Sequence, residues 1–197
     1  MLARVPPLGA ALPRRFGPWT RALGAAALGL AGWRFEGALP DLPKLVVMVA
    51  PHTSNWDFPL GIAVIFALGV RVRWLGKHTL FRGPFGALLR WLGGIPVRRG
   101  ERLGAVDDAV AAIAGTDRMI LALAPEGTRR RVDTWKTGYY AVAERAGVPV
   151  VPVWLDWGRR VVGFGPPTPA LGGADSLTEM LRARYYRREM ARRPEWY

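Results

Sequence analysis

The sequence contains no cysteine among its 197 residues. This absence excludes disulfide bonds, thiolate nucleophiles and thiolate metal sites, and it leaves the redox compartment open. Histidine is almost as scarce, because only His52 and His78 occur, so a zinc site with several histidine ligands is also excluded. We therefore expect no metal site, and any base chemistry must come from very few side chains.

Acidic residues and lysines are also few. The chain has 28 basic against 15 acidic residues and a formal net charge of +13, and only three of the basic residues are lysines. The others are arginines, whose planar guanidinium group binds phosphate through paired hydrogen bonds. This balance favours an anionic partner. On charge alone, nucleic acid, an anionic membrane surface and a phosphorylated substrate all remain open.

The N-terminal part has no apolar run long enough to span a membrane. The uncharged run from Ala22 to Trp33 has twelve residues, whereas a spanning helix needs about twenty. A signal peptide has a similar pattern, but no small-residue cleavage site of the usual kind follows Trp33. We predict that residues 1–35 form a basic amphipathic segment whose helix, within residues 16–33, lies in a membrane interface between Trp19 and Trp33. An ordinary core helix is the alternative.

Apolar runs typical of buried strands alternate with helical patterns along the rest of the chain. The strand-like runs cover residues 45–49, 70–75, 119–124, 148–155 and 161–164. Helical patterns cover residues 58–68, 85–92, 103–114 and 138–146, and an arginine-rich helix is expected at 176–193. Strands that are apolar on both faces and alternate with helices predict an α/β fold with a central, mostly parallel sheet covered by helices. No repeat or long linker divides the chain.

Residues with chemically active side chains follow three of these strands. His52 follows the run 45–49, Lys77 follows the run 70–75, and residues 126–129 follow the run 119–124. Open α/β sheets bind ligands beyond the carboxyl ends of their strands. We therefore expect these side chains to line one pocket.

His52 and Asp57 are the candidate catalytic residues. Ser54 and Asp57 resemble a capping arrangement at the start of a helix, with His52 in the loop before it. A carboxylate in the first turn can reach back to the imidazole, set its tautomer and stabilise its protonated form. The alternative is a hydrogen-bonded loop histidine beside an aspartate that only stabilises the helix dipole.

The segment 124–131, Ala-Pro-Glu-Gly-Thr-Arg-Arg-Arg, predicts an anion site. Backbone N–H groups around Gly127, the Thr128 hydroxyl and the Arg129 guanidinium can all face a phosphate. We expect Glu126 to brace an arginine rather than to act as a second base. The alternative is a tight turn with a solvated basic cluster.

Further basic residues can add to this anion site. Arg98 and Arg99 follow a glycine turn at residues 93–94, and Lys77 and Lys136 are the remaining candidates. Each of them is, by itself, more typical of a solvated surface charge than of a ligand.

Four segments together resemble the glycerolipid acyltransferases, which include the 1-acyl-sn-glycerol-3-phosphate acyltransferases. The segments are His52-x4-Asp57, residues 94–99, residues 125–129 and residues 148–153, and they occur in the order of that family's four sequence blocks. The resemblance runs from about Phe35 to Pro167, and the interior His-Thr-Ser-Asn-Trp-Asp of the first block is similar to a subgroup of short chains. In that family the first block is the catalytic pair, the second and third hold the acceptor phosphate, and the fourth supports the acyl chain or the structure.

The resemblance implies a role for each matching position. His52 would be the base and Asp57 its orienter, and the acceptor site would comprise Arg99, Glu126, Gly127, Thr128 and Arg129. The implied reaction moves a fatty acyl group from acyl-CoA or acyl carrier protein to the hydroxyl of a lyso-lipid, most simply 1-acyl-glycerol 3-phosphate or a related lysophospholipid, without a metal or bound cofactor. Residues 36–197 would form the acyltransferase domain. The protein would lie on an anionic membrane surface, peripherally or monotopically, at the cytoplasmic face of the cell membrane.

Two departures from the family pattern leave the acceptor open. Pro51 stands where an asparagine usually precedes the histidine, and Pro96 stands where an aromatic or aliphatic residue is usual. A lyso-aminolipid or another lipid alcohol without glycerophosphate is therefore an alternative acceptor. A catalytically silent lipid-binding relative is disfavoured by the retained His52 and Asp57. A nucleic-acid-binding protein is the alternative of another class, but many tryptophans lie within apolar runs and no nucleic-acid-binding motif occurs, so no nucleic acid partner is expected.

Overall fold

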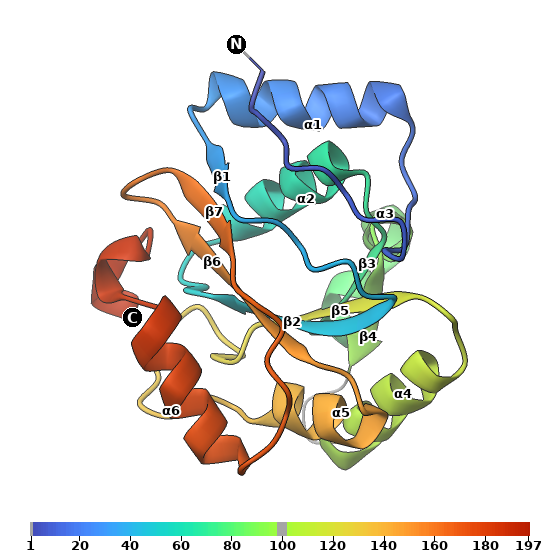
Figure 1. The fold of residues 1–197 in the computed structure, drawn as a ribbon, viewed down its shortest axis with the longest axis vertical. Coiled ribbons are helices and arrows are strands. Elements are labelled where there is room, and N and C mark those ends of the chain that lie inside the picture. The colour runs from blue at the N-terminus through green and yellow to red at the C-terminus, as the bar shows by residue number, and fades with distance from the viewer. Residues whose placement is uncertain (1, 98–101) are drawn as a thin grey trace.

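A computed structural model describes residues 2–97 and 102–197, and a seven-stranded sheet lies at its centre (Figure 1). The strand order is β1-β7-β6-β2-β5-β3-β4, and neighbours run parallel except for the antiparallel pair β6 and β7. The strands are β1 (Arg34–Glu36), β2 (Lys44–Ala50), β3 (Val72–Lys77), β4 (Gly94–Val97), β5 (Met119–Leu123), β6 (Val150–Asp156) and β7 (Val161–Phe164). The expected mostly parallel α/β sheet is confirmed.

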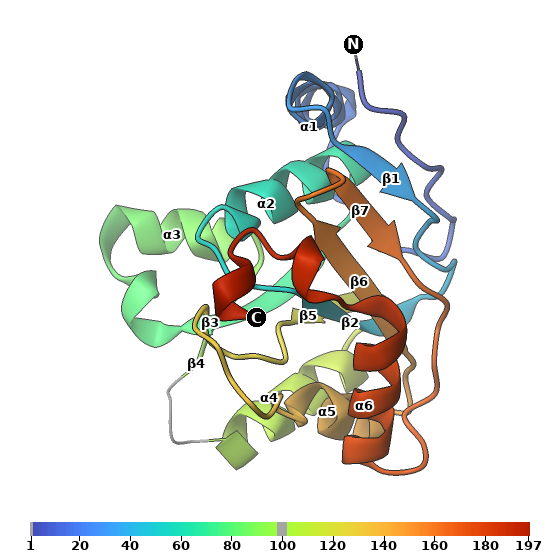
Figure 2. The same ribbon diagram turned by 90° about the vertical axis from the view of Figure 1, so that its left-hand side faces the viewer.

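Helices cover both faces of the sheet (Figures 1 and 2). The helices α1 (Pro18–Leu30) and α2 (Asp57–Leu68) lie on one face, and α4 (Arg102–Ala114), α5 (Gly138–Ala146) and α6 (Ala174–Tyr185) lie on the other. The helix α3 (Gly83–Trp91) follows a short 3-10 helix, η1 (His78–Phe81), and the C-terminal residues form two more, η2 (Arg188–Met190) and η3 (Pro194–Trp196). Each face therefore has its own apolar core.

The central strands are apolar at successive positions because both of their faces are buried. In β2, Leu45 and Val47 belong to the core under α1 and α2, whereas Val46 and Met48 belong to the core under α4, α5 and α6. Successive side chains of a strand point to opposite faces, so a strand covered on both sides is apolar at every position. The edge strands β1 and β4 were not predicted, because they are only three and four residues long and contain no such run.

The arginine-rich helix expected at residues 176–193 is wrong in its second half. Helix α6 ends at Tyr185, and Tyr186 has an extended backbone conformation. The Tyr186 side chain turns into the core, where its hydroxyl donates a hydrogen bond of 2.7 Å to the carbonyl of Met48. After this anchor the chain returns along the sheet edge towards the loop that precedes α2 (Figure 2).

The N-terminal residues share the core of the domain. Leu12 and Leu28 are buried, and a Cβ on Gly24 would collide with the backbone of α2 at Ala67, so α1 packs closely on α2. Strand β1 pairs with β7 across the boundary that we predicted at residue 35. Membrane contact by the outward side of α1 stays a prediction, but the expected interfacial position of Trp33 is wrong, because Trp33 is buried in the core against Trp157. Among the helices of the described residues, none has the length and apolar character to cross a bilayer.

Candidate active site

Three neighbouring strands end at one place in the sheet. Strands β6, β2 and β5 are adjacent and parallel, so their carboxyl ends lie at the same edge. His52 follows β2, Glu126 follows β5, and Trp157 directly follows β6. The structure thus brings His52 and Glu126 together, as expected, and adds Trp157 beside them.

The imidazole of His52 faces the carboxylate of Asp57. Its Nδ1 lies 3.2 Å from Asp57 Oδ2, and the side chain of Asp57 is buried while that of His52 is 22% exposed. The expected contact is therefore confirmed. Because Nδ1 is engaged by the carboxylate, Nε2 is the ring nitrogen available to a substrate.

The start of α2 holds Asp57 in place, although not as a standard capping box. The Ser54 N–H donates to Asp57 Oδ2 at 2.8 Å, which is the reciprocal half of the expected arrangement. The helix begins at Asp57 itself, and Trp56 occupies the N-cap position without a side-chain cap. The carboxylate also receives a hydrogen bond of 2.8 Å from the indole Nε1–H of Trp157 at Oδ1.

Glu126 supports the backbone of His52. Both of its carboxyl oxygens lie within 3.0 Å of the His52 amide nitrogen, and the side chain is buried. Burial raises the pKa of Glu126 to about 8, and the Asp57 carboxylate raises it too, while the His52 N–H and Arg182 lower it. Its hydrogen bonds go to the His52 backbone because β5 lies next to β2, and this adjacency directs Glu126 to the loop after β2. Arg182 interacts with Glu126 through charge, and the expected bracing of an arginine stays a prediction. A role for Glu126 in binding the acceptor stays a prediction.

The turn after Glu126 gathers several predicted anion ligands. Gly127 has a left-handed backbone with φ +62°, and a Cβ there would collide with the ammonium group of Lys136. The Lys136 backbone N–H donates to the Pro125 carbonyl at 2.7 Å, which holds this lysine against the turn. The Thr128 hydroxyl accepts the Arg130 N–H at 3.4 Å. Arg129 is half-buried, and its buried Nε has no hydrogen-bond partner among the described residues.

The other predicted basic residues are not on the turn that follows β5. Lys77 is exposed at the carboxyl end of β3, which is the strand beside β5. Arg99, with Arg98, falls in residues 98–101 and lies outside the residues that the structure describes. His78 lies in η1, and its ring is half-buried.

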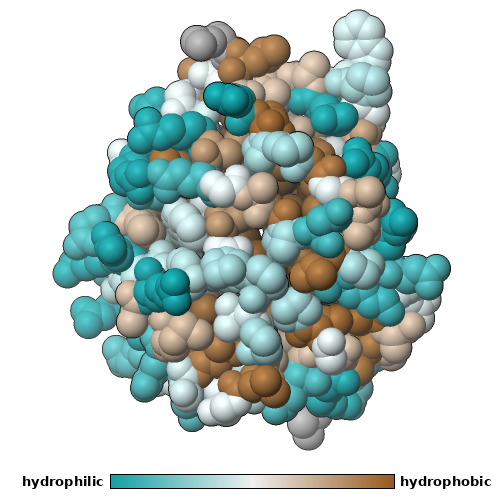
Figure 3. All heavy atoms as spheres, in the orientation of Figure 1, coloured by the Kyte–Doolittle hydropathy of each residue, from teal (hydrophilic) through white to brown (hydrophobic). Residues whose placement is uncertain are grey.

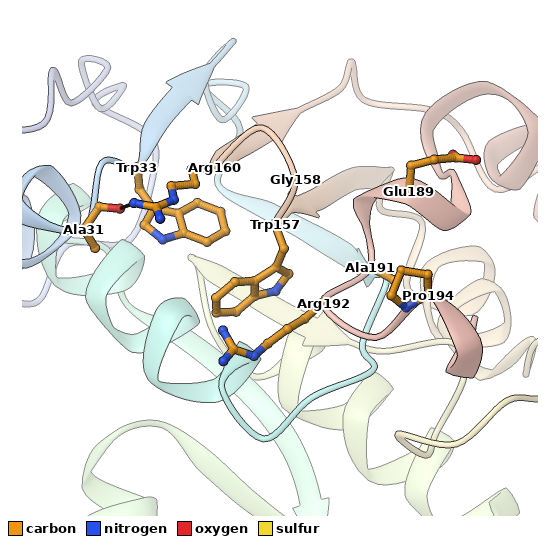
Figure 4. Close-up of a pocket in the computed structure, with 9 residues that line it drawn as sticks. All are labelled: Ala31, Trp33, Trp157, Gly158, Arg160, Glu189, Ala191, Arg192 and Pro194. Atoms are coloured by element: carbon orange, nitrogen blue, oxygen red, sulfur yellow. Dashed lines mark hydrogen bonds between the residues drawn. The ribbon is translucent and has the colours of Figure 1, made fainter.

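Residues that the sequence interpretation missed surround Trp157 (Figure 4). The guanidinium of Arg192 lies 4.4 Å from the centre of the Trp157 ring, and Trp33 packs against that ring edge-on at 5.0 Å. A cavity of about 690 Å³ opens beside these side chains. Trp157 follows a predicted strand, so the rule of strand ends could have found it, but nothing in the local sequence pairs it with Arg192.

Comparisons with known proteins agree with this geometry. The family model described as Acyltransferase matches residues 38–156. The 1-acyl-sn-glycerol-3-phosphate acyltransferase of Haemophilus influenzae is 29% identical over 133 residues, which are 63% of this chain and 54% of that protein. The enzyme of the same name from Escherichia coli strain K12 is 32% identical over 114 residues, which are 54% of this chain and 45% of that protein. The chain thus spans about half the length of these curated relatives.

A solved structure shows the same fold. The crystal structure of the 1-acyl-sn-glycerophosphate acyltransferase PlsC from Thermotoga maritima superposes with a TM-score of 0.57 and 21% identity, over 86% of this chain and 80% of that one. The matched family region contains His52, Asp57 and Glu126, and ends one residue before Trp157. With a family model over more than half of its length and the fold of a solved relative, this chain belongs to the acyltransferase family.

Proposed function

We propose that this chain is an O-acyltransferase that moves a fatty acyl group from a thioester to the hydroxyl of 1-acyl-glycerol 3-phosphate or a related lysophospholipid. The observation that carries the proposal is the contact of His52 Nδ1 with Asp57, which leaves Nε2 open to a substrate hydroxyl. The names of the curated relatives support the acceptor. The thioester is acyl-CoA or acyl-ACP, in which the acyl group is bound to acyl carrier protein.

The proposed reaction uses His52 as base and then as acid. Nε2 takes the hydroxyl proton while the hydroxyl oxygen bonds to the thioester carbonyl carbon; the carbon–sulfur bond then breaks, and the protonated imidazole returns the proton to the thiolate. Asp57 holds the imidazole and stabilises its charged form. Such proton transfer contributes about 10²- to 10⁴-fold in rate. The proposed acyl transfer requires no enzyme nucleophile, metal or bound cofactor.

The turn after β5 supplies the proposed acceptor phosphate site. Thr128, Arg129 and Lys136 lie on or against this turn, within the same sheet edge as His52. The buried Nε of Arg129 has no protein partner in the described part of the chain, and an unpaired buried donor of this kind costs about 1–3 kcal/mol. This Nε donor can serve a phosphate. Lys77 and Arg99 are proposed to add to the same charge.

The proposed location is an anionic membrane surface at the cytoplasmic face, where the lipid substrates are found. Trp19, Leu23 and Leu30 of α1 are 90%, 64% and 82% exposed. Their spacing places them on one side of the helix, opposite Gly24 and Leu28, which pack on the domain. Hydrophobic side chains are visible at the end of the molecule where α1 lies (Figure 3). An outward apolar side on a strongly basic chain suits a helix that lies in a membrane interface.

The test is transfer of a labelled acyl group by the purified protein. Wild type is supplied with 1-acyl-glycerol 3-phosphate and either acyl-CoA or acyl-ACP, the acyl thioester of acyl carrier protein, and product is measured by lipid mass spectrometry. We expect His52→Ala to lower kcat by at least about 10²-fold, because the base is lost. His78→Ala, at the only other histidine, is the matched control and should keep most of the activity.

Undiminished transfer by a folded His52→Ala protein contradicts the mechanism. A panel of acceptors decides the substrate: a preference for a lyso-aminolipid over 1-acyl-glycerol 3-phosphate would retain acyl transfer and reject the proposed acceptor.

A further inference from the structure

The two oxygens of the Asp57 carboxylate have different partners. Oδ2 receives the Ser54 N–H at 2.8 Å and lies 3.2 Å from His52 Nδ1. Oδ1 receives the indole N–H of Trp157 at 2.8 Å. A carboxylate with donors on both oxygens cannot rotate without losing a hydrogen bond, and these bonds to a charged group are among the strong ones. Trp157 therefore limits the orientation in which Asp57 can meet His52.

The ring of Trp157 is held by its position after β6 and by two packing partners. Trp157 directly follows β6, and β6 pairs with β2, whose carboxyl end leads to His52. One face of the indole is covered by the guanidinium of Arg192 at 4.4 Å, and Trp33 packs edge-on at 5.0 Å. Figure 4 shows Trp157 between these two side chains at the wall of the 690 Å³ cavity. Cation–π and edge-to-face contacts of this kind favour one ring orientation.

We infer that Trp157 is a positioning residue for acyl transfer: its indole N–H holds the Asp57 carboxylate in the orientation that keeps His52 Nδ1 engaged and Nε2 directed to the substrate. The inference rests on the proposed function. Trp157 acts through Asp57 and does not contact the reacting atoms. It lies in the β6–β7 turn, one residue beyond the region that the family model matches.

Replacing Trp157 with phenylalanine removes the donor and retains an aromatic ring. We expect kcat to fall about tenfold, which is the usual effect of one hydrogen bond to a charged group, and KM for both substrates to change less than about twofold. The low-pH limb of the kcat/KM profile should move to higher pH, because a carboxylate with one donor fewer stabilises the protonated imidazole more strongly. The titratable groups around Asp57 are His52 and Glu126, and the guanidinium of Arg192 faces the indole.

The matched control is Trp154→Phe, three residues earlier on β6. Trp154 is also half-buried, but it stacks on Tyr185 of α6 and packs with the core on the opposite face of the sheet. It should reproduce the loss of packing without the loss of kcat or the change in pH profile. If Trp157→Phe and Trp154→Phe have the same kcat and the same pH profile, Trp157 has only a structural role and the inference is overturned.

A spectroscopic measurement tests the contact without any substrate. The chain has nine tryptophans, and sequential assignment identifies the indole N–H resonance of Trp157 among them. In the Asp57→Asn protein this resonance should move upfield, because the charged acceptor is lost, while that of Trp154 should stay in place. A Trp157 resonance that does not move overturns the inference even if Trp157→Phe does not fold. If wild type transfers no acyl group but the resonance moves, the proposed function fails and the contact stands.

Discussion

At the scale of single residues, Arg129 is the side chain whose removal tests whether the acceptor carries a phosphate. Its guanidinium is half-buried next to Thr128, and its Nε has no hydrogen-bond partner in the part of the chain that the structure describes. A guanidinium binds phosphate through a planar pair of donors. The affinity for the acceptor should therefore depend on Arg129 only if the acceptor carries a phosphate. A substitution of Arg129 thus distinguishes a phosphate-bearing acceptor from a neutral one.

We expect Arg129→Ala to raise KM for 1-acyl-glycerol 3-phosphate by about tenfold or more, as the loss of a charged hydrogen bond predicts. KM for a monoacylglycerol, which lacks the phosphate, should not change. Steady-state kinetics with both acceptors measure this. Arg145→Ala removes the same charge from α5, where Arg145 pairs with Asp107 at 2.7 Å, and should alter neither KM. An unchanged KM for the phosphorylated acceptor in Arg129→Ala would remove Arg129 from the site.

At the scale of elements, the loop between β2 and α2 is tied to the turns after β5 and β6. Glu126 binds the His52 backbone from one side, and Trp157 binds Asp57 from the other. A third tie comes from the C-terminal segment, where the Arg193 N–H donates to the Thr53 hydroxyl at 3.2 Å. The loop that carries the proposed catalytic pair is therefore held by three segments distant from it in sequence, and its geometry depends on the order of the strands.

Glu126 makes one of these ties sensitive to pH. Its pKa of about 8 lies above the usual 4.5, mainly because of burial, so the folded protein binds a proton that the unfolded chain has lost between these values. Stability from this group is present at low pH and is lost as pH rises towards 8, by up to about 1.4 kcal/mol per pH unit. In Glu126→Gln this loss is absent, so the difference in unfolding free energy, variant minus wild type, should increase from pH 5 to pH 8.

Urea unfolding at pH 5, 6.5 and 8 measures that difference, and the other titrating groups cancel in it. Parallel pH dependences for wild type and Glu126→Gln would show that Glu126 does not titrate in this window.

At the scale of the whole molecule, exposed apolar side chains gather on α1 and α3. In α1 these are Trp19 and Leu23, and in α3 they are Phe85, Leu88 and Trp91, all at least 48% exposed. The two helices are linked by packing, since Phe16, just before α1, lies 6.0 Å from the ring of Trp91. With a net charge of +13, such a surface suits an anionic bilayer, because each basic residue near it contributes about 1 kcal/mol.

We expect the double variant Trp19→Ser, Leu23→Ser to lose most of its binding to anionic phospholipid vesicles, because the apolar area that enters the interface is removed. Co-sedimentation at a fixed salt concentration measures the bound fraction. Leu171→Ser is the control, since Leu171 is 74% exposed but precedes α6 on the opposite face of the sheet. Equal loss of binding in both proteins would contradict membrane contact through α1.

The sequence by itself was sufficient to predict what depends on neighbouring residues. His52 and Asp57 lie five residues apart, so one loop and one helix start are enough to place them near each other. The central strands were predictable too, because burial on both faces imposes long apolar runs. The edge strands were not, since β1 and β4 are short and only partly covered.

Only the tertiary structure decided the partners of that pair. Glu126 is 74 residues from His52, Trp157 is 100 residues from Asp57, and Arg193 is 140 residues from Thr53. The contacts of Glu126 and Trp157 follow from the strand order β6-β2-β5, which local periodicity does not specify, because any parallel order buries the same apolar runs. The proposed catalytic pair is thus local in sequence, whereas the residues that hold it are brought there by the tertiary structure.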